Sequence, residues 1–222
     1  LLAGHGKYEQ AFTDVNRAIR LKGDEPEYYV NRGSMLGEKG DYDKAIADLN
    51  KAIGLNPKSS MAYINRCRVN KLLSHYDAAI ADGTKAVELD PQNAWGYTNR
   101  GAAFFAKGDG KHAIADYSQA LKISPNLPEA NSGLAICLST SPDPHLRDGK
   151  RALIYATKAC ELTQWKNPKF FRSLGEAYAE NGDFEHAIEW EKKFLNLWTG
   201  VGRKTNVRLK NYSAHQPWRN RT

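Results

Sequence analysis

The sequence predicts an all-α fold, a solenoid built from repeated pairs of helices. Two observations support this prediction: a short motif that begins with alanine recurs every 34 residues, and a second alanine lies seven residues after the first in each copy. The first alanines are Ala11, Ala45, Ala79 and Ala113, and the second are Ala18, Ala52, Ala86 and Ala120. Small residues at this period and spacing are typical of stacked helical repeats that share one core.

Residues 26–59 show how one repeat forms its two helices. We expect the first helix over Glu27–Lys39, a turn at Gly40-Asp41, and the second helix over Tyr42–Gly54, after which Pro57 cannot continue a helix. Apolar residues recur at helical steps of three and four: Tyr29, Leu36, Tyr42, Ile46, Leu49 and Ile53. One helix pair cannot bury this stripe alone, so neighbouring repeats must stack on it.

The repeated positions resemble the tetratricopeptide repeat (TPR) of bacterial type. The residues that carry the resemblance in one repeat are Tyr29, Gly33, Gly40, Tyr42, Ala45, Ala52 and Pro57. The pattern returns from Tyr63, Tyr97 and Phe171, and it covers about Leu1 to Thr199. The resemblance implies a right-handed superhelix that ends in a C-terminal capping helix.

This register divides the chain into seven segments. A partial first repeat, with only its second helix, covers 1–25, which we interpret as an excised fragment or a fraying start. Further repeats cover 26–59, 60–93, 94–127 and 168–201, a variant repeat covers 128–167, and a basic capping helix with a tail covers 202–222. The variant repeat carries the insertion Ser139–Lys150, in which Asp148 is the expected N-cap of the following helix. A purely structural loop and a loop that contacts a partner both remain open.

The basic character of the chain belongs to its tail. The net charge is +7, and Gly200–Thr222 holds six basic residues and no acidic one. We expect Lys204–Arg219 to form an amphipathic helix with Val207 and Leu209 apolar, which shields the last repeat. Contact between the tail and nucleic acid is the less favoured alternative.

The sequence contains no pattern that predicts catalysis. The three cysteines lack CxxC spacing, and the six histidines lack the spacing of metal ligands. No apolar run is long enough to span a membrane. We therefore expect no enzyme activity, no cofactor and no metal, and buried thiols would suit a reducing compartment such as the cytoplasm.

Arginines and aspartates recur together. Arg32, Arg66 and Arg100 are followed sixteen residues later by Asp48, Asp82 and Asp116. In the two later repeats leucines replace the arginine, and Tyr155 and Trp190 replace the aspartate. Because the charge and its countercharge disappear together, we predict structural ion pairs within a repeat or with the preceding one. Asp14 would be the preceding partner of Arg32.

An asparagine precedes each of these arginines: Asn31, Asn65 and Asn99. The resemblance implies that the first helix of each repeat lines a concave groove. The asparagines would then form a ladder similar to that in the TPR domain of O-linked N-acetylglucosamine transferase, where asparagines hold the backbone of an extended polypeptide. An amide both donates and accepts, so it suits a peptide unit. A capping or solvent-facing role is the alternative.

Other residues expected in the groove combine apolar anchors with cations: Met61, Ile64, Arg68, Lys71, Trp95, Thr98 and Phe105. They are needed because three asparagines supply at most several kcal/mol, whereas association costs at least about 4 kcal/mol. The sequence therefore predicts a scaffold that binds an extended peptide with an apolar residue beside an acidic one. Packing of Trp95 and Phe105 between repeats is the alternative for those side chains. Self-association, or docking within a larger protein, is the alternative function.

Overall fold

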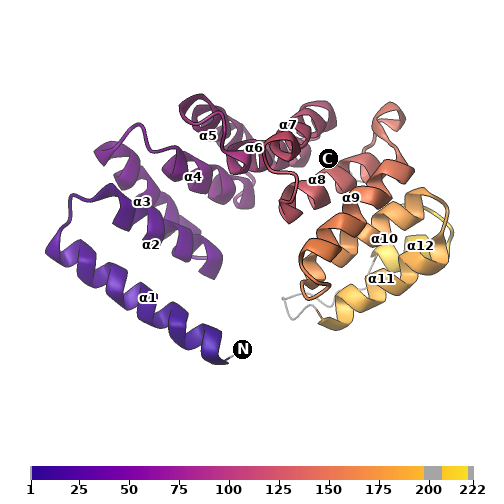
Figure 1. Cartoon of the computed structure of the whole chain (residues 1–222), viewed down its shortest axis with the longest axis horizontal. Helices are drawn as coiled ribbons and strands as arrows, with labels where there is room; N and C mark the ends of the chain where they lie inside the picture. Colours follow the sequence, from indigo (N-terminus) through magenta and orange to yellow (C-terminus); the bar gives the residue numbers. More distant parts are fainter. Residues whose placement is uncertain (1, 198–206, 220–222) are drawn as a thin grey trace. The chain divides into compact units, whose positions relative to one another are not determined.

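The structure is a computed structural model that describes residues 2–197 and 207–219, with side chains from residue 9 onwards. Every regular element in the described part is a helix (Figure 1). The α-helices are α1 (Leu2–Leu21), α2 (Pro26–Lys39), α3 (Tyr42–Leu55), α4 (Ser60–Leu72), α5 (Tyr76–Leu89), α6 (Ala94–Ala106), α7 (Gly110–Ile123), α8 (Pro128–Thr140), α9 (Gly149–Leu162), α10 (Phe171–Glu180), α11 (Phe184–Leu197) and α12 (Val207–Ser213). Two short 3-10 helices, η1 (Pro144–Leu146) and η2 (Pro168–Phe170), lie in the loops beside α9.

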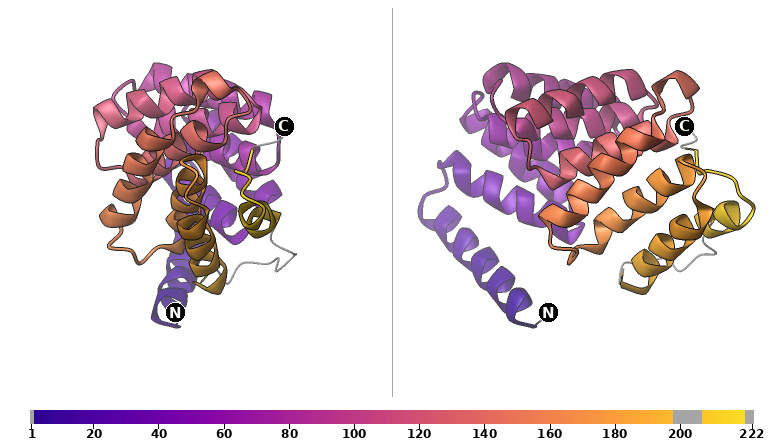
Figure 2. Two further views of the ribbon diagram at one scale, coloured as in Figure 1. Left: turned by 90° about the vertical axis from the view of Figure 1, so that its right-hand side faces the viewer. Right: turned by 45° about the vertical axis from the view of Figure 1, so that its right-hand side comes forward.

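Consecutive helices pack as pairs, and the pairs follow the predicted period. The helices α2 and α3, α4 and α5, α8 and α9, and α10 and α11 each lie against one another, and both views in Figure 2 show such neighbours running in opposite directions. The prediction of an all-α fold built from paired helices is confirmed.

The chain forms two compact units, residues 1–103 and residues 104–222. The first unit holds α1 to α5 and most of α6, and the second holds the remaining helices. Each unit has its own core, in which most of the side chains with no exposure to solvent are alanines; Leu49 in the first unit and Leu134 and Leu174 in the second are at most 1% exposed.

Small residues and left-handed turns allow the helices to pair closely. A Cβ atom at Gly33 would lie 2.8 Å from the Cγ of Leu49, so only glycine lets α2 approach α3 at this point. The turn after α2 contains Gly40 at φ 92°, which is the left-handed C-cap residue of the helix. At the equivalent turn after α4 the residue is Ser74, which adopts φ 62°, a conformation that a serine reaches only with strain.

The insertion in the second unit is an ordered loop. It contains η1, and Asp148 accepts a hydrogen bond from the backbone N–H of Arg151 at 3.0 Å. Asp148 is therefore the N-cap of α9.

A helix does cap the last repeat, but it is shorter than predicted and is anchored by a different residue. Lys204 lies outside the described residues, and α12 covers Val207–Ser213 (Figure 1). Val207 is 55% exposed, whereas Tyr212 is fully buried against α10 and α11. The helix stops early because His215 is left-handed, at φ 53°, and Pro217 follows.

Candidate functional site

The arginine and aspartate of each repeat in the first unit meet as a bidentate pair. Arg32 donates from Nε and Nη2 to the two carboxylate oxygens of Asp48, at 2.6 and 2.7 Å. Arg66 donates in the same way to Asp82, at 3.0 and 2.6 Å. Asp48 and Asp82 are 7% and 5% exposed. The hydrogen bond to Asp48 raises the pKa of Arg32, so the guanidinium stays charged.

The partner from the preceding repeat is a neutral side chain. Arg32 Nη1 donates to Asn16 at 2.8 Å, and Arg66 Nη1 donates to Asn50 at 2.6 Å. Asp14 is exposed, and Asn16 takes the place that had been predicted for it.

Within the first unit, the third arginine makes the same kind of contact with the preceding repeat. Arg100 Nη1 donates to Thr84 at 3.4 Å, and its guanidinium lies 5.7 Å from the ring of Tyr97. Asp116 belongs to the second unit, where it is 6% exposed.

The three asparagines occupy equivalent positions but have different surroundings. Asn31 is exposed, and Asn65 is 8% exposed. Asn99 is half-buried, and its Nδ2 donates to the carbonyl of Trp95, one turn earlier in α6, at 3.0 Å. Of the three asparagines, the structure thus leaves only Asn31 exposed.

Two residues predicted for the groove are part of the interior. Ile64 is 4% exposed and Thr98 is 5% exposed. The hydroxyl of Thr98 donates to the carbonyl of Ala94 at 2.8 Å within its own helix. Both predictions were wrong because these residues lie on the packed sides of α4 and α6.

Met61, Asn65, Arg68 and Leu72 lie one helical turn apart on α4 and form a stripe, which we call the α4 stripe; its two ends are exposed, Arg68 is half-buried and Asn65 is buried. Met61 and Leu72 are 46% and 44% exposed at its two ends. Sequence reasoning missed Leu72 because it compared positions 34 residues apart. Successive steps of four, three and four within α4 would have found it.

Arg68 extends from the α4 stripe across to α2. Its Nη2 donates to the carbonyl and to the hydroxyl of Ser34, at 3.3 and 3.2 Å. Both acceptors are neutral, and the residue is only half-buried. This cation can therefore also receive a carboxylate from a ligand.

The apolar end of the stripe continues onto α6. Trp95, 34 residues after Met61, is 42% exposed. Asn93 links the two helices, since its Nδ2 lies 4.0 Å from the sulfur of Met61 and its Oδ1 accepts from the N–H of Trp95 at 3.1 Å. Lys71 is half-buried beside the stripe, and Phe105 is half-buried in the second unit.

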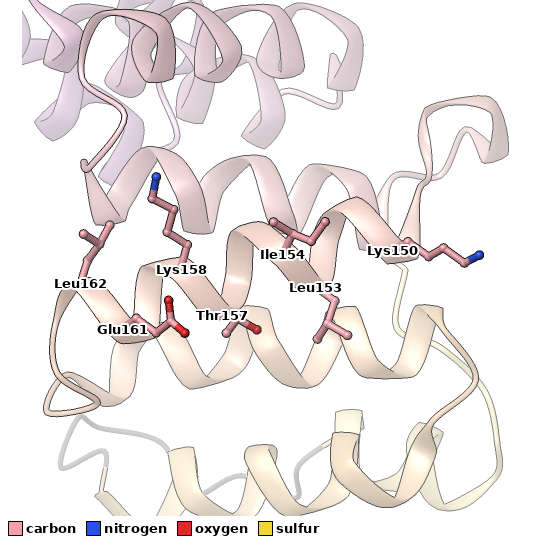
Figure 3. Close-up of a pocket in the computed structure, with 7 residues that line it drawn as sticks. All are labelled: Lys150, Leu153, Ile154, Thr157, Lys158, Glu161 and Leu162. Carbon is pink, nitrogen blue, oxygen red and sulfur yellow. The ribbon is translucent and has the colours of Figure 1, made fainter.

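A separate shallow groove of about 650 Å³ runs along α9 in the second unit (Figure 3). Its lining residues are Lys150, Leu153, Ile154, Thr157, Lys158, Glu161 and Leu162. Ile154 is 64% exposed. The groove contains none of the residues predicted for binding.

The described residues hold no group of three histidine, cysteine or acidic side chains that could bind a metal ion. The three cysteines are buried, and burial raises the pKa of Cys67 to about 12. None of the described helices is both long and apolar enough to cross a membrane.

Comparisons with known proteins agree on the repeat. Residues 26–59 and 94–127 match the tetratricopeptide repeat model, and residues 73–108 match a second TPR repeat model. No curated protein matches the chain.

Similar solved structures include a thermophilic TPR protein of Thermus thermophilus, which is 19% identical with a TM-score of 0.67 over 86% of this chain and 98% of that one. YrrB, a TPR protein with an unusual peptide-binding site, is 21% identical with a TM-score of 0.55 over 82% and 91% of the two chains. A chain of the APC/C hetero-tetramer Cut9–Hcn1 is 17% identical with a TM-score of 0.81, and 95% of this chain covers 40% of that one. At these identities the likeness concerns the fold. The matched segments confirm that the chain contains tetratricopeptide repeats, as predicted.

Proposed function

We propose that this chain is a protein-interaction module that binds an extended peptide along the α4 stripe and the first turn of α6. The observation that carries the proposal is the exposure of Met61, Leu72 and Trp95, each above 40%, around the cation of Arg68. Apolar, aromatic and arginine side chains of this kind are favoured at binding hot spots. The preferred ligand has apolar residues flanking an acidic one.

The magnitudes indicate a moderate affinity. Full burial of a large apolar side chain contributes about 1.5–3 kcal/mol, so three half-exposed anchors supply roughly 3 kcal/mol. A charge-assisted hydrogen bond to Arg68 adds about 1.5–3 kcal/mol. Because association costs at least about 4 kcal/mol, further contacts to the peptide backbone are required.

Asparagine side chains are our candidates for these backbone contacts. Asn31 is open to an incoming peptide unit. Asn99 must release the carbonyl of Trp95 before its Nδ2 can donate to a ligand, which lowers its net contribution. Asn65 is 8% exposed between Met61 and Arg68, so it can contact only a backbone that lies close to α4.

The likeness in fold to YrrB, which has a peptide-binding site, supports the proposal. A random-peptide display selection on the purified chain tests it, repeated with Met61→Ala/Trp95→Ala and, separately, with Asn31, Asn65 and Asn99 all changed to alanine. We expect a consensus with an acidic residue that the first variant loses and the second weakens. Leu21→Ala is the matched control, because Leu21 is 75% exposed on α1, away from the stripe. A consensus that survives Met61→Ala/Trp95→Ala would contradict the proposal.

A further inference from the structure

After α12 the chain folds back over the second unit as an extended segment. The N–H of Gln216 donates to the carbonyl of Asn211 at 2.9 Å, which closes a turn at the end of the helix. Residues 216–219 then run without regular structure. The segment ends in Trp218-Arg219, and both side chains have defined partners.

Trp218 packs on an apolar surface. It lies against a cluster built on Ala179 and Ala187 from α10 and α11, and on Tyr212 from α12. The guanidinium of Arg208 lies 4.6 Å from the centre of the indole ring. The indole is therefore held by apolar contacts and by a cation–π contact.

Arg219 meets the carboxylate of Glu180. Its Nη1 lies 2.8 Å from Glu180 Oε2 and 3.3 Å from the carbonyl oxygen of Ser139. The other oxygen of Glu180 accepts from Arg147 Nε at 3.0 Å, and Arg147 Nη1 donates to the carbonyl of Ser141 at 2.9 Å. Glu180 thus joins the insertion to the tail, two features of the sequence that the α4 stripe does not involve.

The contact made by Arg219 is incomplete. One nitrogen, Nη1, serves Glu180, Ser139 and the carbonyl of its own neighbour Trp218, at 3.0 Å for the last. Glu180 Oε2 is buried and receives no aligned hydrogen bond. The Arg219 side chain is 31% exposed. A guanidinium that approached with two nitrogens would bind this carboxylate more strongly.

The capping helix does not depend on this contact. Tyr212 is fully buried, and Arg208 donates to Glu176 at 2.9 Å. Tyr212 also packs on Ala179 and Ala187, and Arg208 also pairs with Glu176, so we expect these contacts to hold α12 when the extended segment leaves.

We propose that Glu180, Arg147, the carbonyl of Ser139 and the apolar cluster beneath Trp218 form a second peptide site, which binds an extended peptide with an aromatic residue followed by arginine. The Trp218-Arg219 segment of the chain occupies this site in cis, so an external peptide must displace it. The site lies wholly in the second unit and does not rest on the α4 stripe.

The test uses a fluorescein-labelled peptide with the sequence of residues 214–219 and measures its anisotropy on the full chain. We expect Trp218→Ala/Arg219→Gln to bind the peptide at least about tenfold more tightly than the wild type, because the competing segment is weakened. Adding Glu180→Gln to this variant should remove the gain. Adding Glu185→Gln, an exposed glutamate on α11, should leave it unchanged.

A second peptide, with glutamine in place of its arginine, tests the same contact without a further change in the protein, so the result does not depend on whether a variant folds. It should bind the Trp218→Ala/Arg219→Gln chain at least about tenfold more weakly than the original peptide, since one charge-assisted pair is lost. Equal affinity of the wild type and this variant, no binding to the variant, or equal binding of the two peptides would each overturn the proposal.

Discussion

Removal of the Asp82 carboxylate should destabilise the first unit strongly, because several donors depend on it. Asp82 is 5% exposed and accepts from Arg66 Nε and Nη2, and from Asn70 Nδ2 at 2.9 Å. The change Asp82→Ala leaves the buried Asn70 amide and the Arg66 guanidinium without this acceptor. Loss of one partner of a buried pair costs about 3–5 kcal/mol. The Arg66 side chain is 23% exposed and keeps Asn50, so water can recover part of the loss. We therefore expect a cost near the lower end of that range, about 3 kcal/mol.

The assay is urea unfolding, monitored by far-UV circular dichroism. The m-value is fitted separately for each variant, because repeat arrays can unfold in parts. Asp24→Ala, at an exposed aspartate in the loop before α2, is the control and should change stability by less than about 0.5 kcal/mol. In a double-mutant cycle, Arg66→Ala added to Asp82→Ala should cost less than the sum of the two single changes, because no orphaned charge remains. A loss below about 0.5 kcal/mol for Asp82→Ala, the size of an ordinary surface substitution, would refute the reasoning.

Three further predictions concern packing, strain and ionisation. Gly33→Ala should destabilise the chain by about 1–3 kcal/mol in urea unfolding, because its Cβ would lie 2.8 Å from Leu49; an unchanged midpoint would show that α2 and α3 can separate. Ser74→Gly should raise stability by about 0.5–1 kcal/mol, because it relieves the left-handed strain at φ 62°; a loss of stability would assign the serine a contact that outweighs this strain. Burial raises the pKa of Cys67 from 9.0 to about 12, so the folded state keeps a thiol proton that the unfolded chain releases. This contribution is fully present below about pH 9 and is lost as pH rises towards about 12, with a slope of about 1.4 kcal/mol per pH unit. Raising the pH to about 10 should therefore lower the free energy of unfolding of the wild type more than that of Cys67→Ala. Equal losses of stability in the two proteins would contradict the raised pKa.

The repeat period predicts the fold well because it records packing that recurs in every unit. The expected helices at Glu27–Lys39 and Tyr42–Gly54 differ from α2 and α3 by one residue each. The tail has no repeated counterpart, so sequence reasoning placed Val207 at the interface, where the structure places Tyr212.

Sequence reasoning about the site was less successful, because exposure depends on side chains that are not repeated. Asn31 and Asn65 share one position in the repeat, yet the residue one turn earlier is Glu27 in one case and Met61 in the other. Asn31 is exposed, whereas Asn65 is buried. Equivalent position therefore does not imply equivalent access.

The arginine pairs show a similar limit. A spacing of sixteen residues separates Arg32 both from Asp48 ahead of it and from Asn16 behind it. The structure shows both contacts, with the charged partner in the same repeat and the neutral partner in the preceding one. The spacing alone could not have assigned these two roles.

The most direct test of the proposed function is the dissociation constant of a selected peptide, measured by isothermal titration calorimetry on the wild type, Trp95→Ala and Leu21→Ala. Loss of a half-exposed aromatic anchor of this kind should weaken binding about tenfold in Trp95→Ala, and Leu21→Ala should bind like the wild type. Equal affinity for the wild type and Trp95→Ala would show that the peptide binds elsewhere, and would contradict a binding surface on the α4 stripe and the first turn of α6.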